Sequence, residues 1–83
     1  MTRTQQYRID GRNVVITRCA DGWPIVYTLV IDGMATRGHV EKTVLARYRA
    51  FDSRGHLIGQ YLVLREALTA VVRYQLSPGH IPT

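Results

Sequence analysis

The chain has a single cysteine and no long hydrophobic run, and both features bear on the cellular compartment in which it folds. Cys19 is the only cysteine among 83 residues, so no disulfide can form within the chain. A small domain that folds without disulfides is typical of a reducing compartment. The apolar segment 25–31 is much shorter than the ~20 residues of a membrane-spanning helix, and the N-terminal MTRTQQYR lacks the apolar core of a signal peptide. We therefore expect a soluble, cytoplasmic protein with no membrane partner.

Residues suited to catalysis are also scarce. Ser53 and Ser77 are the only serines, and neither stands in the context of a nucleophile elbow. Cys19 offers a nucleophile with a histidine as its base, but a small residue at the end of a strand is the simpler interpretation. The three histidines have no spacing typical of metal ligands: His39, His56 and His80. The sequence therefore predicts a protein that is not an enzyme, with no metal site and no cofactor.

The four aspartates stand where turns are expected. Asp-Gly occurs at 10–11, 21–22 and 32–33, eleven residues apart each time, and DSRG follows at 52–55. Asp and Gly tolerate the positive φ of tight hairpin turns, so this context explains the aspartates better than a catalytic carboxylate set does. Successive antiparallel turns alternate between the two ends of a sheet. Asp10 and Asp32 should therefore lie far from Asp21.

Runs of β-branched and aromatic residues separate these turns, which indicates an antiparallel meander. The runs are QYRI, NVVITRC, PIVYTLVI, TVLARYRAF and HLIGQY. The third run is apolar on both faces, which predicts a central strand. The segment 33–42, GMATRGHVEK, has glycines and mixed polarity, so we expect a long, mobile connection. Such a loop is either a contact element or a surface loop without a role.

Beyond Val63 the apolar period becomes helical. Leu64, Leu68, Val71 and Gln75 follow one another at i, i+4, i+7 and i+11, which predicts an amphipathic helix that covers one face of the sheet. The predicted fold class is therefore α+β: a four- to five-stranded antiparallel β-meander packed against one C-terminal α-helix. We expect one domain over 1–76 and a flexible tail over 77–83. The helix has more apolar surface than one sheet face requires, so a homodimer would use Leu68, Val72 and Leu76.

The net charge is +5, and it comes almost entirely from arginine. Ten of the eleven basic residues are Arg, and Lys42 is the only lysine. A GC-rich genome, whose codons favour Arg, is one explanation. Selection for the planar guanidinium, which suits phosphate, carboxylate and aromatic partners, is the other. A basic chain binds nucleic acid or an acidic protein surface, and the charge does not choose between them.

Strand alternation predicts which side chains share a face. In the run 43–51, Tyr48 belongs to the helix-covered face, whereas Arg47, Arg49 and Phe51 belong to the other. We expect Arg18 to stand beside them on the uncovered face. An aromatic among arginines stacks bases and contacts phosphates, and it also anchors protein interfaces. The predicted partner-binding or nucleic-acid-binding residues are Arg18, Arg37, Lys42, Arg47, Arg49, Phe51 and Arg54.

Two function classes follow from these patterns. We favour a small non-enzymatic module that docks on a protein or nucleoprotein partner through its arginine-bearing sheet and loops. Small arginine-rich chains of this character are frequent in phages and mobile elements, and some inhibit a host machine, as anti-CRISPR proteins do. The alternative is a DNA- or RNA-binding domain that uses an arginine-rich sheet face. Binding that weakens steeply with salt would favour nucleic acid.

Overall fold

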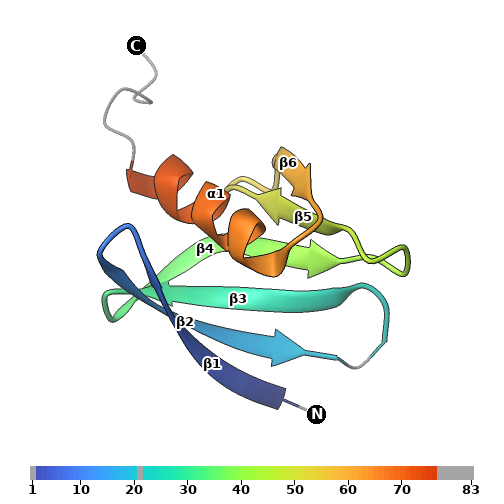
Figure 1. The fold of residues 1–83 in the computed structure, drawn as a ribbon, viewed down its shortest axis with the longest axis horizontal. Helices are drawn as coiled ribbons and strands as arrows, with labels where there is room; N and C mark the ends of the chain where they lie inside the picture. The colour runs from blue at the N-terminus through green and yellow to red at the C-terminus, as the bar shows by residue number, and fades with distance from the viewer. Residues whose placement is uncertain (1, 21, 77–83) are drawn as a thin grey trace.

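The computed structural model describes residues 2–20 and 22–76, and of residues 2, 37, 75 and 76 it describes the backbone only. Asp21 and the tail expected over 77–83 lie outside the described residues. The described chain forms six strands and then one helix (Figure 1). The elements are β1 (Thr2–Ile9), β2 (Arg12–Cys19), β3 (Ile25–Ile31), β4 (Met34–Lys42), β5 (Tyr48–Phe51), β6 (Leu57–Tyr61) and α1 (Leu64–Leu76).

The strands form one antiparallel meander with the spatial order β1-β2-β3-β4-β5-β6. The α+β class, the meander and the C-terminal helix are therefore confirmed. The predicted number of strands, four to five, was too low. Strand β3 lies inside the sheet, as its apolar residues indicate, and its buried side chains alternate with half-buried ones and with the exposed Thr28.

Strand β4 was expected to be a mobile connection, and that expectation was wrong. It pairs with β3 through Thr28↔His39 and with β5 through Val40↔Ala50. Val40 is fully buried, although the polar residues around it gave the segment little strand character. Pairing with a strand on each side overrides weak local propensity, because strand preference depends strongly on neighbours. The residues 43–47, which were assigned to a strand, form the turn between β4 and β5 instead.

Two of the predicted Asp-Gly turns are confirmed in detail. Asp10 and Gly11 have φ angles of 51° and 76°, and Asp32 and Gly33 have 50° and 82°. Positive φ at both central residues is the signature of a type I′ turn, whose twist matches that of the flanking strands. Asp10 and Asp32 thus stand at the same end of the sheet, in the β1–β2 and β3–β4 hairpins, and the β2–β3 connection between them lies at the other end (Figure 1).

The helix packs on one face of the sheet, against β4, β5 and β6 (Figure 1). Its apolar stripe is buried completely, with Ala67, Leu68, Val71 and Val72 at 0% exposure. The predicted homodimer contact is therefore wrong for Leu68 and Val72, because both side chains are buried in the core of a single chain. The side chain of Leu76 lies outside the described part.

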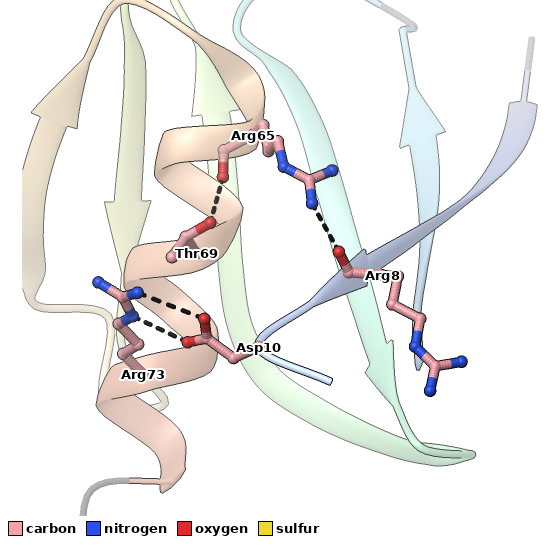
Figure 2. Close-up of polar contacts among 5 residues, drawn as sticks. All are labelled: Arg8, Asp10, Arg65, Thr69 and Arg73. Atoms are coloured by element: carbon pink, nitrogen blue, oxygen red, sulfur yellow. Dashed lines mark hydrogen bonds and ion pairs between the residues drawn. The ribbon is translucent and has the colours of Figure 1, made fainter. Parts of the chain in front are cut away.

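The turn between β1 and β2 is fastened to the outer side of the helix (Figure 2). Nε and Nη2 of Arg73 donate to the two carboxylate oxygens of Asp10 at 2.8 and 3.3 Å. About two helical turns earlier, Nη2 of Arg65 donates to the carbonyl oxygen of Arg8 at 2.6 Å. The guanidinium of Arg73 lowers the pKa of Asp10, and the carboxylate raises the pKa of Arg73. The helix is thus contacted by β4, β5 and β6 and by the β1–β2 turn. The opposite face of the sheet is uncovered.

Candidate binding surfaces

The open face of the sheet, opposite the helix, presents a row of small and aromatic side chains. Residues directly opposite one another on neighbouring strands point to the same face. Following these pairs across all six strands gives one continuous row: Thr4, Thr17, Thr28, His39, Phe51 and Leu57. The rings of His39 and Phe51 stack with their centroids 4.7 Å apart and an angle of 8° between them. The middle of this face is therefore mostly uncharged.

A negative and a positive side chain face each other beside the middle of this row. Glu41 and Arg49 stand opposite each other on β4 and β5. Nε2 of His39 lies 3.1 Å from Oε2 of Glu41, and Nε of Arg49 donates to Oε1 of Gln60 at 3.3 Å. A basic sheet face of the kind that binds nucleic acid is not formed at this place.

Arg18 does not join the open face, which corrects the grouping expected from the sequence. It lies opposite Tyr27 on β3, and Tyr27 is buried under the helix side of the sheet. Arg18 alternates with Val15 and Thr17 and so shares the face of Val14 and Ile16. Arg47 lies in the turn after β4, exposed but outside the sheet. Of the three arginines assigned to the uncovered face, only Arg49 stands on it.

The other predicted binding residues are dispersed. Lys42 belongs to the helix side, where its Nζ lies 5.7 Å from the centroid of the Tyr48 ring. Arg54 is exposed in the turn between β5 and β6. Arg37 is part of β4, and its side chain lies outside the described part. The prediction that separated Tyr48 from Phe51 is confirmed, because Tyr48 packs on the core and Phe51 stacks on the open face.

A different surface collects the exposed hydrophobic side chains, and sequence reasoning missed it. Seven large apolar residues are at least half exposed among those described. Five of them lie on the β2–β3, β4–β5 and β6–α1 connections, which all leave the same end of the sheet (Figure 1). We call these five residues the apolar end: Trp23, Val44, Leu45, Leu62 and Val63. Their exposed fractions run from 51% for Val63 to 77% for Leu45.

The β4–β5 turn presents two of these residues on a well-defined backbone. The amide of Ala46 donates to the carbonyl of Thr43 at 3.0 Å, and the amide of Thr43 donates to the carbonyl of Arg47 at 2.9 Å. The hydroxyl of Thr43 also accepts from the amide of Arg47 at 3.3 Å. Ala46 closes the turn with a φ of 60°. Val44 and Leu45 therefore stand at the tip of a hydrogen-bonded turn, where polar residues and glycine are usual.

An open groove of about 750 Å³ runs between β6 and the exposed side of α1. Ile58 and Tyr61 form one wall, and Glu66, Ala70 and Tyr74 belong to the helix wall. Arg65, Thr69 and Arg73 complete the lining of the groove. Within residues 2–20 and 22–76, no group of three His, Cys, Asp or Glu side chains is placed to hold a metal ion.

Asp52 is the one buried charged residue of the described chain, with 4% exposure. Its Oδ1 accepts from the amides of His56 at 2.8 Å and Arg54 at 2.9 Å. The hydrogen bond from the His56 amide is the largest cause of the lowered pKa of Asp52. The hydroxyl of Tyr74 donates to the same carboxylate. These contacts account for Asp52 as the organiser of the DSRG turn, which confirms the turn interpretation of this aspartate.

Comparison of the chain with protein-family models, with curated proteins and with solved structures found no match. In the described part of the chain, the single helix is too short and too polar to cross a membrane.

Proposed function

We propose that this chain is a small, non-enzymatic module that docks on a protein or on the protein part of a nucleoprotein complex. The observation that carries the proposal is the distribution of surface chemistry: large apolar side chains gather at one end, and the arginines are spread over separate faces. A desolvated apolar centre with charged residues at its rim is the usual anatomy of a protein interface. An accessory or inhibitory subunit of a larger protein machine would work in this way.

Nucleic-acid binding is the less favoured alternative, because the basic side chains are dispersed over the surface. A nucleic-acid interface relies on several cations that reach phosphates along one face. Here Arg73 is engaged by Asp10, Arg65 by a backbone carbonyl, and Arg12 by the carboxylate of Asp32 at 2.9 Å. Arg49 stands on the open face opposite Glu41. The net charge of +5 thus does not add up to one basic surface.

Affinity capture from the native cell or host lysate, with and without nuclease, tests the proposal. We expect a protein that stays bound after nuclease treatment and at high salt, because apolar burial is not screened. In a gel-shift assay, replacing Arg47 and Arg49 with Ala should change any weak DNA binding little. Capture of nucleic acid alone, with steep salt dependence and loss of the gel shift in the Arg47→Ala, Arg49→Ala variant, would contradict the proposal and favour the alternative.

A further inference from the structure

We propose that the free edge of β1 is a docking site for an extended, acidic segment of the protein partner, which pairs with this edge as an added strand. The inference rests on the function proposed above, and it names one contact and the chemistry of the segment that binds there. Strand β1 stands first in the sheet order, so β2 pairs with only one of its two edges (Figure 1). Arg3, Thr4, Gln5 and Gln6 follow one another along β1 and are all exposed.

The register of the first hairpin shows which backbone groups of β1 point away from the sheet. Ile9 and Arg12 flank a two-residue turn, and residues in this position exchange both hydrogen bonds of a pair. Bonded and non-bonded pairs then alternate along an antiparallel ladder. The outward N–H and C=O groups of β1 therefore include those of Thr4, Gln6 and Arg8.

The contacts of these residues agree with that assignment. The carbonyl of Arg8 accepts from Nη2 of Arg65 on the helix, outside the ladder (Figure 2). In the described part of the chain, no protein group pairs with the outward N–H and C=O groups of Thr4 and Gln6. Donors and acceptors that alternate along an edge match another extended polypeptide, whose backbone has the same spacing. Nucleic acids and lipids lack such a backbone, so the edge favours a protein segment.

The opposite edge of the sheet is less suited to an added strand. Strand β6 has five residues, and its pairing with β5 shifts register between Ala50 and Phe51. Short and irregular edges resist further pairing. Strand β1, in contrast, pairs with β2 over eight residues without a register shift and contains no proline.

Two arginines determine the charge of the segment that fits. Arg3 and Arg18 lie directly opposite each other on the helix side of the sheet, and like charges in such a pair repel. Neither guanidinium has an acidic partner within residues 2–20 and 22–76. A strand added to β1 places one side chain beside Arg3 on this face. A carboxylate at that position reduces the repulsion and accepts a charge-assisted hydrogen bond.

A second copy of this chain fits the edge less well. Two β1 strands that pair about a two-fold axis are antiparallel, so Arg3 of one copy lies beside the turn end of β1 in the other. The charged side chains around that end are Arg8, Arg12, Arg65, Arg73, Asp10 and Asp32. Each aspartate is already paired with an arginine, so the excess of positive charge repels Arg3. The other described carboxylates belong to β4, the β5–β6 turn and α1: Glu41, Asp52 and Glu66.

Site-specific photo-crosslinking in native lysate locates the contact. A benzoylphenylalanine is placed at Gln5 on β1, at Thr17 on the open face, at Leu45 in the apolar end or at Ala70 in the groove beside β6. We expect position 5 to crosslink to one defined protein, within a segment that contains Asp or Glu. Protein crosslinks from the other positions but not from position 5, or a segment without an acidic residue, overturn the inference and leave the proposed function standing.

Two substitutions at Thr4 then separate the backbone of the edge from its side chain. Thr4→Pro removes an N–H that makes no bond to β2, so the hairpin itself tolerates the proline. Thr4→Ala keeps this N–H. We expect Thr4→Pro to weaken binding of the purified, crosslinked partner by about tenfold or more, whereas Thr4→Ala binds like the unaltered chain. Equal affinity of the two variants, with unchanged circular dichroism, overturns the inference.

A second pair of substitutions tests the charge. Arg3→Glu should weaken binding of the same partner by about tenfold or more, because it sets a carboxylate against an acidic segment. Arg54→Glu makes the same change of charge in the exposed β5–β6 turn and is the matched control. An equal effect of the two substitutions overturns the inference.

Amide hydrogen exchange, resolved by residue, needs no substitution. In the free chain the amides of Thr4 and Gln6 should exchange faster than those of Gln5 and Tyr7, which are bonded to β2. With the purified partner bound, exchange at Thr4 and Gln6 should slow by about tenfold or more. Unchanged exchange at both amides in the complex overturns the inference.

The remaining outcomes separate the inference from its premise. A crosslink from position 5 to a second copy of the chain overturns the inference in favour of self-pairing. Capture of nucleic acid alone, or of no protein, contradicts the proposed function and the inference together.

Discussion

Replacing Ala46 with glycine should stabilise the folded chain, although an alanine-to-glycine substitution usually destabilises a protein. It stands at a φ of 60° and its amide hydrogen bond closes the β4–β5 turn. A left-handed conformation costs a residue with a β-carbon about 1–2 kcal/mol. Glycine avoids this cost, but it destabilises the folded state by about 0.5–1 kcal/mol because it loses more conformational entropy on folding than alanine does. The difference predicts that Ala46→Gly raises the free energy of unfolding by up to about 1.5 kcal/mol, or the melting temperature by up to about 12 °C.

Urea titration and thermal melting, both followed by circular dichroism, measure this change. Ala35→Gly is the control, because Ala35 is exposed in β4 and has no positive φ. There the substitution should lower the free energy of unfolding by about 0.5–1 kcal/mol. Opposite signs for the two variants support a strained turn at Ala46. If Ala46→Gly destabilises the protein as much as Ala35→Gly does, the reasoning about left-handed strain is refuted.

Two other substitutions test the core and the buried carboxylate. Leu68→Ala should lower the free energy of unfolding by about 2–5 kcal/mol, because Leu68 is fully buried in the core; the loss should not vary with protein concentration, as it would if Leu68 joined two copies. Asp52 has a lowered pKa in the folded chain, so its contribution to stability is present above the ordinary value of 3.8 and disappears as pH falls through the lowered value. Asp52→Asn should therefore make stability less sensitive to acid in a pH series of urea titrations, and an unchanged acid dependence would contradict the assigned role.

Local patterns predicted the elements whose causes are local. The Asp-Gly pairs tolerate positive φ wherever they occur, so the turns at 10–11 and 32–33 were readable from the sequence. The helical period from Leu64 onward marked the side of α1 that is buried. Alternation along β5 placed Tyr48 and Phe51 on opposite faces correctly.

Patterns that depend on distant partners were misjudged. The segment 34–42 has glycines and charges, and it becomes a strand because β3 and β5 pair with both of its edges. The run 43–47 has the residues of a strand, and it becomes a turn because its ends must lead into two antiparallel neighbours. Leu68 and Val72 were read as surplus, although the helix is deep enough in the fold to bury both completely.

The candidate site shows the same division. Sequence reasoning chose arginines because charge is visible in a composition, and it placed Arg18 beside Arg49 before the faces of separate strands were known. It passed over Trp23, Leu45 and Leu62 because each looks like an ordinary apolar residue near a loop. Their shared location is visible only when the connections are seen to leave one end of the sheet (Figure 1).

The sequence by itself determined the α+β class, the order of meander and helix, and the turn chemistry, because turn φ angles and apolar periods are properties of neighbouring residues. Only the tertiary structure decided that six strands form, that Arg18 and Arg49 stand on opposite faces, and that five exposed hydrophobic residues lie on connections at one end of the sheet. Those outcomes depend on which distant segments pair, and strand register and sheet packing set them through contacts that no local window contains.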